Sequence, residues 1–356
     1  MNVQPLGLNR QTYISPEEVD ARDYKIVEDP ESVSKKIERE TALCASMTFE
    51  NKTRHGSEPL TQLHTLEFRQ RSFEGQFTAR CMTGPFMFRL KEVNFNHPLT
   101  NTGCGYAQGE RPHMEDVHLA KEFDVGSKRI SLLAVFDGHG GDSAALFVAR
   151  NIERVLKGFL EKFGLSDVGI WNALKITCVH LDRAYLLLAG TTANIALFVD
   201  GHLWVANVGD SRALLLTKES IVQLSDDAKC GTRFDSSIVK RGAQVIRRRV
   251  GGAIAPARYI GNPAQGAATT PRPKITKTKL QGRALLIQMS DGITDVLSNL
   301  KIAALVSKFQ SNSWYPGEIA AGIVEAAYAG GSKDNLTVLA TYLKIPEDAI
   351  IPEAKP

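Results

Sequence analysis

The sequence predicts an α+β fold in which helices pack on antiparallel sheets. Two long helical patterns follow one another at residues 142–165 and 170–188. Two apolar runs, Ala193–Val199 and His202–Val208, flank Asp200-Gly201, a pair typical of the two-residue turn of a β-hairpin. Further helical patterns lie near the C-terminal end, beside short apolar runs. Adjacent helices together with hairpin strands favour separate layers of helix and sheet.

Residues 1–100 read as an N-terminal extension. Ser15-Pro16-Glu17-Glu18 has the form of a helix start, and Asp29-Pro30-Glu31 repeats it before a short amphipathic pattern at residues 33–43. One or two strands are expected within Phe77–Phe95. Three interpretations stay open for this extension: it packs on the main domain, it docks a partner, or it is partly disordered.

The pattern is clearer after residue 100. A buried strand is expected at Ser131–Phe136, followed by the two helices, the hairpin and a further strand at Ala213–Leu216. Residues 263–282 are typical of a mobile loop. The remaining expected elements are a strand at Leu285–Met289, helices at Leu300–Phe309 and Glu318–Tyr328, and a closing strand at Leu336–Leu343.

Composition excludes several classes of protein. An apolar fraction of 43% can build a large core, and a net charge of +4 is too small a bias to indicate nucleic acid. Five scattered cysteines without a CxxC pair argue against a disulfide framework or a structural zinc site, and favour a reducing compartment. Since no signal pattern and no run of roughly 20 apolar residues occurs, we expect no membrane span and a cytoplasmic location.

Acidic residues recur where expected strands begin or end. Five acidic fragments carry this pattern: Glu115-Asp116, Asp137-Gly138-His139-Gly140-Gly141, Gly209-Asp210-Ser211, Ser290-Asp291 with Asp295, and Asp334-Asn335. Carboxylates at strand ends can converge although they are far apart in sequence. Oxygen ligands without accompanying cysteines favour hard cations such as Mg²⁺ or Mn²⁺. The leading hypothesis is therefore metal-assisted hydrolysis of a phosphate ester.

Each fragment alone has a plainer interpretation. Asp137 before a glycine turn is more often a helix cap, and His139 a structural turn histidine. Asp291 is an ordinary turn residue, Asp334-Asn335 ordinary loop chemistry, and Glu115-Asp116 a charged pair. For Arg111 a surface ion pair and a substrate-binding role weigh about equally. The joint occurrence of the fragments in one order carries the argument.

In that order the motifs resemble those of the metal-dependent, type 2C serine/threonine protein phosphatases. The motifs that carry the resemblance are Arg111-Pro-His-Met-Glu115-Asp116, Val135-Phe-Asp137-Gly-His-Gly-Gly141, Gly190-Thr-Thr-Ala193, Val205-Ala-Asn-Val-Gly-Asp210-Ser-Arg212, Arg249-Val-Gly-Gly, Ser290-Asp291-Gly-Ile-Thr-Asp295 and Gly331-Ser-Lys-Asp334-Asn335. Together they are far more specific than any single motif. The resemblance implies a four-layer α-β-β-α sandwich of two antiparallel sheets flanked by helices, formed by residues 101–345 and followed by a tail at 346–356.

The resemblance also implies roles for individual residues. Asp137, Asp291 and Asp334, with the Gly138 carbonyl, would bind two central Mg²⁺ or Mn²⁺ ions. Glu115 and Asp116 would hold metal-bound waters, and Asp210 and Asp295 match positions of a third, weaker ion. Arg111 would bind the phosphate of a phosphoprotein, a hydroxide bridging the two metals would attack it, and His139 would protonate the leaving serine or threonine oxygen.

Two segments depart from the family pattern. Asp227-Ala228-Lys229-Cys230 stands where a His-Lys-Pro element is common, and Ala257–Asn262 replaces a Ser-Arg-Ala-Leu-Gly-Asp run. Both belong to the segment that we call the flap, residues 227–262, which also contains Arg247-Arg248-Arg249. The departures put substrate preference in doubt. Two alternatives therefore stay beside the phosphatase: a non-catalytic scaffold, and a hydrolase of the same fold that removes a nucleotide from protein.

Overall fold

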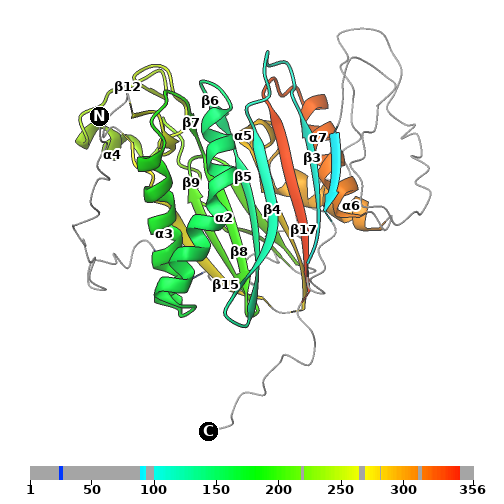
Figure 1. Ribbon diagram of the computed structural model, residues 1–356. Helices are drawn as coiled ribbons and strands as arrows, with labels where there is room; N and C mark the ends of the chain where they lie inside the picture. The colour runs from blue at the N-terminus through cyan, green and yellow to red at the C-terminus, as the bar shows by residue number, and fades with distance from the viewer. Residues whose placement is uncertain are drawn as a thin grey trace, which may run out of the picture.

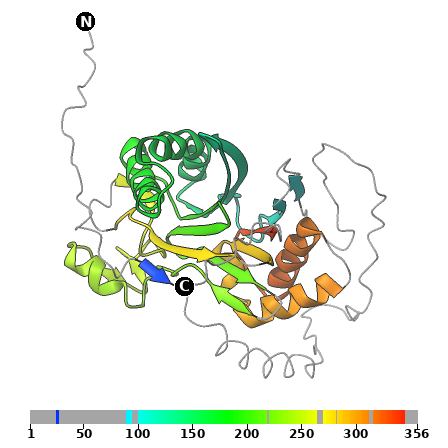
Figure 2. The same cartoon turned by 90° about the horizontal axis from the view of Figure 1, so that it is seen from below.

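Two six-stranded sheets lie face to face, and helices cover the outer face of each (Figure 1). This computed structural model describes residues 24–26, 89–93, 100–217, 220–263, 269–280, 282–311 and 315–344. The view from below places the green helices on one side of the sheets and the orange helices on the other (Figure 2). The sequence-based expectation of an α+β sandwich of four layers is confirmed.

The first sheet carries two long helices, α2 (Ser143–Phe163) and α3 (Asp167–Ala184), on its outer face. Its strands run in the order β1 (Tyr24–Ile26), β15 (Lys274–Lys279), β9 (His202–Val208), β8 (Ala193–Val199), β5 (Lys128–Phe136) and β4 (Val117–Val125). Neighbouring strands are antiparallel except β1 and β15, which are parallel.

The second sheet carries α6 (Asn299–Ser311) and α7 (Pro316–Ala329) on its outer face. Its strands run in the order β11 (Ile221–Gln223), β10 (Arg212–Leu216), β16 (Arg283–Met289), β17 (Leu336–Lys344), β3 (Thr100–Ala107) and β2 (Arg89–Val93). Every pairing in this sheet is antiparallel.

Shorter elements complete the described part of the chain. A three-stranded sheet joins β14 (Ile260–Gly261), β7 (Gly190–Thr191) and β6 (Gly138–His139), and a two-stranded sheet joins β12 (Val245–Ile246) and β13 (Arg249–Val250). The short helices are α4 (Asp235–Lys240) and α5 (Asp291–Thr294).

Successive residues of each strand point to opposite faces of its sheet, so the apolar residues of one strand contribute to two different hydrophobic cores. In β5, Ile130 and Leu132 pack under α2 and α3, whereas Leu133 and Val135 pack between the two sheets. In β16 the residues that face α6 and α7 include Ile287. Because successive side chains of a strand point to opposite faces, these fully apolar runs are buried on both sides.

Two glycines of β3 let α7 lie unusually close to the second sheet. A Cβ atom on Gly103 would lie 2.0 Å from the backbone nitrogen of Gly317, and one on Gly105 would lie 2.6 Å from that of Ala321. Any larger residue at these positions would push the helix away from the strand.

Most of the elements expected after residue 130 are confirmed, and three differences are informative. The loop expected at 263–282 is wrong for residues 274–279, which form β15; its alternation of lysine and threonine hides a strand with Ile275 buried. The second helix ends at Ala184 rather than 188, because Tyr185 leaves the helix to bond Ser143 through its hydroxyl at 2.7 Å. Strands β3 and β4 were not expected.

The extension lies mostly outside the described residues. The two helices expected before residue 44 belong to that part of the chain. Within residues 1–100 the structure gives β1 and β2, which add edge strands to the two sheets, and β2 falls inside the expected strand region. Among the described residues no helix is long and apolar enough to cross a membrane.

Candidate active site

Strand register brings the acidic fragments to one end of the sandwich. Val117, the first residue of β4, pairs with Phe136, the last of β5, so Asp116 and Asp137 leave adjacent strands together. In the other sheet Met289 pairs with both Arg212 and Val338. That register places Asp210, Asp291 and Asp334, which lie within two to four residues of these positions, at the same end.

Asp137 is held by contacts with both sheets. Its backbone N–H donates to the hydroxyl of Thr192 at 2.9 Å, and the N–H of Thr192 donates to the Asp137 carbonyl at 2.9 Å. From α5, which follows β16 of the second sheet, the backbone N–H of Asp291 donates to Asp137 Oδ2 at 3.5 Å. The side chain therefore points to the junction between the sheets.

Glycine is required beside two of these carboxylates. A Cβ on Gly138 would lie 2.5 Å from the Glu115 carbonyl oxygen, and one on Gly292 would lie 2.0 Å from that of Asn335. These close approaches pack the acidic loops against one another.

Asn335 organises the segment that carries Arg111 and Glu115. Its side-chain amide donates to the carbonyls of Gln108, at 2.7 Å, and His113, at 3.0 Å, while its Oδ1 accepts from the Glu115 N–H at 2.8 Å. Glu115 in turn accepts from the Gly141 N–H at 2.9 Å. Asn335 belongs to the motif Gly331–Asn335, but these contacts were not predicted from the sequence.

A second set of buried amides joins the sheets behind the site. Gln288 donates to Asn194 Oδ1 at 2.8 Å, and Asn194 donates to Asn207 Oδ1 at 2.8 Å. Asn207 bonds the carbonyl of Gly209, directly before Asp210, at 3.0 Å. Sequence reasoning missed this chain of amides; its only signal was a polar residue inside each of three apolar runs.

The carboxylates interact strongly with one another. Burial raises the pKa of Asp137 well above its usual range, and the charges of Asp116, Asp291, Asp210 and Asp334 raise it further. Burial also raises the pKa of Asp116 to about 7, against the opposing effect of the Ser290 and Thr337 hydroxyls. Burial and Asp291 raise the pKa of Asp210. So many close carboxylates can all be ionised at neutral pH only with cations beside them.

The donor set fits hard divalent cations. Asp116 Oδ2 and Asp210 Oδ2 are buried and accept no hydrogen bond from the described residues. Carboxylate oxygens of this kind suit Mg²⁺ and Mn²⁺. The described residues do not place three ligand groups around one point, and two basic side chains, Arg111 and Lys229, pair with Asp334 and Asp291.

Arg111 is the first of these basic residues. Its Nη2 lies 2.5 Å from Asp334 Oδ2, and the arginine side chain is 50% exposed. It therefore stands at the rim, where it can reach an anionic ligand by exchanging one charged partner for another. Both interpretations given for Arg111, the surface ion pair and the anion-binding group, agree with this position.

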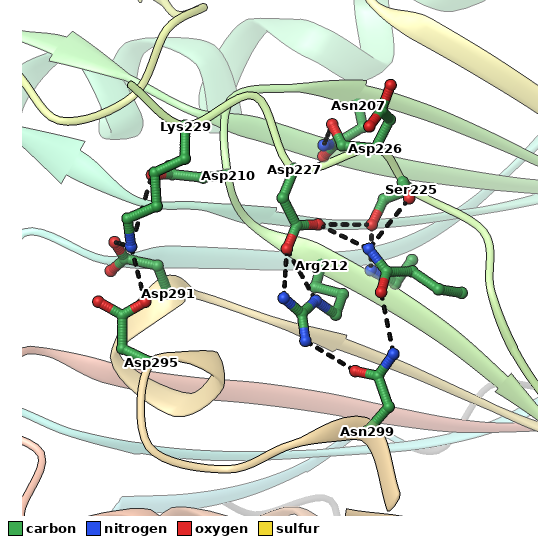
Figure 3. Close-up of polar contacts among 12 residues, drawn as sticks. Asn207, Asp210, Arg212, Ser225, Asp226, Asp227, Lys229, Asp291, Asp295 and Asn299 are labelled. Atoms are coloured by element: carbon green, nitrogen blue, oxygen red, sulfur yellow. Dashed lines mark hydrogen bonds and ion pairs between the residues drawn. The ribbon is translucent and has the colours of Figure 1, made fainter. Parts of the chain in front are cut away.

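Lys229, from the flap, is the second basic residue, and sequence reasoning gave it no role. Figure 3 shows its side chain extending toward Asp291 and Asp295, with Asp210 beside it. Next to it, Arg212 binds Asp227 through Nε at 2.8 Å and Nη2 at 2.5 Å (Figure 3). Asp295 lies at the rim with its side chain 57% exposed.

His139 lies under the flap. Its ring meets the edge of Tyr259 at a centroid distance of 5.0 Å, and a Cβ on Gly190 would lie 2.4 Å from its Nε2. Burial lowers its pKa to about 4, so the ring is neutral at pH 7. Its Nε2 finds no hydrogen-bond partner in the described structure.

The chain is similar to known proteins over this same region. The family model described as Protein phosphatase 2C matches residues 101–336. A rice (Oryza sativa subsp. japonica) protein named "Probable protein phosphatase 2C member 13, mitochondrial" is 31% identical over 246 residues, which cover 66% of this chain and 67% of the rice protein. "Probable protein phosphatase 2C 76" of Arabidopsis thaliana is also 31% identical over 246 residues, covering 66% of this chain and 58% of the relative.

Solved structures share the fold. A Caenorhabditis elegans sex-determining protein aligns with TM-score 0.63 at 23% identity, covering 71% of this chain and 67% of that one. A Toxoplasma gondii phosphatase aligns with TM-score 0.63 at 20% identity, covering 72% and 96%.

The family match includes every acidic fragment described above. Alignments with the first four curated relatives span 52–67% of those proteins' own length. The matched region, the four-layer sandwich and the order of the motifs agree, and this chain belongs to the protein phosphatase 2C family.

Proposed function

We propose that this chain is a metal-dependent protein phosphatase that hydrolyses phosphoserine and phosphothreonine in proteins. The observation that carries the proposal is the convergence of five carboxylates, with an arginine at their rim, at one end of the sandwich. Membership of the protein phosphatase 2C family supports it.

In this proposal Asp137, Asp291 and Asp334, with the Gly138 carbonyl, hold two Mg²⁺ or Mn²⁺ ions. Glu115 and Asp116 hold waters around these ions, and Asp210 and Asp295 form a third, weaker metal-binding site. When bound, the ions would supply a hydroxide as the nucleophile toward phosphorus and would neutralise the phosphate charge.

The side chains of the protein do the rest. Arg111 exchanges its contact with Asp334 for the substrate phosphate and orients it. His139 donates a proton to the serine or threonine oxygen as it leaves, since an alkoxide is a poor leaving group. Because the buried ring is neutral at pH 7, this role requires it to take up a proton as well as to gain contact with the substrate beneath Tyr259.

We assign the activity to residues 101–345 and treat the extension, 1–100, as a candidate surface for partner docking, with 346–356 as a tail. Phosphoproteins are the proposed substrates, in a signalling role that opposes a kinase. Cys178 and Cys230 are free and buried, which supports a reducing compartment, and we propose the cytoplasm.

The experiment is hydrolysis of p-nitrophenyl phosphate and of a phosphothreonine peptide by the full chain, with Mn²⁺, with Mg²⁺ and with EDTA. Asp137→Asn and Asp291→Asn are measured beside it. The proposal expects turnover that EDTA abolishes and that both substitutions largely remove. Undiminished turnover in either variant would contradict it, and a chain that binds metal without turnover would favour the scaffold or the nucleotide-removing hydrolase.

A further inference from the structure

Lys229 places its ammonium group among three carboxylates from two parts of the chain, Asp210 before β10 and Asp291 and Asp295 at the two ends of α5. Its Nζ lies 2.6 Å from Asp295 Oδ1, 3.1 Å from Asp291 Oδ2 and 4.0 Å from Asp210 Oδ2 (Figure 3). An ammonium is a compact charge with three donors, so it can serve three carboxylates much as a small metal ion would.

The backbone around Lys229 is fixed on both sides. The Ala228 N–H donates to the Gly209 carbonyl at 2.8 Å, and the Cys230 N–H donates to the Ala255 carbonyl at 3.1 Å. Ala228 and Cys230 are each 1% exposed. Since the attachment point is buried on either side, the lysine is aimed at the acidic end by the fold.

A lysine ammonium is ordinarily charged at neutral pH. Lys229 therefore brings one positive charge to within 4.0 Å of three carboxylates.

We propose that Lys229 acts as a built-in cation in the site formed by Asp210, Asp291 and Asp295. Its positive charge weakens the binding of a third divalent ion at that site. The inference rests on the proposed function, in which Asp210 and Asp295 form the third metal-binding site. A divalent ion bound by both would lie close to the ammonium, and like charges at such distances repel strongly. The lysine thereby favours the two central ions over the third.

Mn²⁺ binding tests the proposal without using activity. Equilibrium dialysis and the electron paramagnetic resonance signal of free Mn²⁺ give the number and affinity of bound ions for the full chain and for Lys229→Met. Lys277→Met is the matched control, because it also removes one positive charge and an ion pair, in this case with Asp167. We expect Lys229→Met to bind one further Mn²⁺ about tenfold more tightly than the parent, from the lost repulsion alone.

The gain should disappear in the double variant Lys229→Met/Asp295→Asn and be absent in Lys277→Met. An unchanged number and affinity in Lys229→Met would overturn the proposal while leaving the two central ions, and so the proposed function, intact. A parent chain that binds no Mn²⁺ would contradict both. If Lys229→Met does not fold, Lys229→Gln keeps hydrogen-bond donors without the charge, and the same tighter third ion is expected.

Discussion

The strand ends and the flap both contribute to the candidate active site, but different interactions hold them. The strand ends are fixed by sheet register and by the buried amides of Gln288, Asn194 and Asn207. The flap is made of short elements around its own small core, which includes Phe234, Ile238 and Tyr259. The difference separates two contributions: the strand ends hold the acidic groups, while the flap supplies Lys229, which pairs with Asp291, and Tyr259, which packs on His139.

The largest expected effect is at the strand ends. Asp137→Asn removes the charge most closely surrounded by other carboxylates, so metal affinity and kcat should both fall, kcat by about a thousandfold. Metal binding and phosphate release measure this. Asp124→Asn, on the exposed surface of β4, is the control and should leave both unchanged.

The second effect is a pH dependence that only the metal-free protein shows. The folded pKa of Asp116, about 7, lies above its ordinary 3.8, so the folded state favours the protonated form. The contribution of protonated Asp116 to the free energy of unfolding is fully present below about pH 4. It is lost as the pH rises through 7, which lowers the stability by about 2–4 kcal/mol. The melting temperature in EDTA should therefore fall between pH 5 and pH 8, and Mn²⁺ should restore it at pH 8.

Asp116→Asn should flatten that pH dependence. If the melting temperature of the metal-free protein stays level or rises from pH 5 to pH 8, the buried carboxylates do not lower its stability in the way described.

The flap should be sensitive to the loss of Tyr259. This ring is 1% exposed and packs on His139, so Tyr259→Ala should cost about 3 kcal/mol and lower kcat, because a cavity opens beside the histidine. Denaturant unfolding and kinetics measure the two effects. Tyr259→Phe keeps the ring and should retain most of both; equal losses in the two variants would mean that packing on His139 is not what matters.

Asn194→Ala should cost about 2 kcal/mol, because it leaves the buried Asn207 Oδ1 without its donor and removes one of the hydrogen bonds of Gln288. Asn151→Ala, which removes a hydrogen bond to Phe147 within α2, should cost less. Chemical unfolding measures the loss of stability in both variants. Equal losses would show that the buried amide chain contributes no more than an ordinary side-chain hydrogen bond.

The smallest effect is at the outer turn of the flap. Arg247 has φ of +51°, a left-handed conformation that favours glycine, so Arg247→Gly should stabilise the protein by about 0.5 kcal/mol. Arg249→Gly, at a residue of β13 outside that conformation, should not stabilise it. Melting temperatures distinguish the two; a gain in both would point to relief of charge repulsion instead.

The sequence predicted the regular parts of this fold because their periods are clear. The hairpin of β8 and β9 has the expected bounds, since Asp200-Gly201 is a strong turn signal and both strands are apolar throughout. Strand β15 was not predicted because its sequence of lysines and threonines has little apolar character. Pairing with its neighbours in the sheet makes this segment a strand. Strand β3 escaped because its glycines serve the close approach of α7.

Part of the candidate site was predicted because the apolar strands beside it have a clear sequence pattern. The acidic residues follow or precede apolar strands, so their convergence could be inferred from sequence. The contacts of Asn335, the buried amides and the ion pairs of Lys229 could not, because each depends on residues more than 60 positions away in sequence or on a register that only the fold defines.

The most direct test of the metal centre is the anomalous scattering of Mn²⁺ in crystals grown with the ion. The account predicts two strong peaks bounded by Asp137, Asp291 and Asp334, and a third peak near Asp210 and Asp295 that strengthens in Lys229→Met. Peaks elsewhere in the protein, with none at the strand ends, would contradict it.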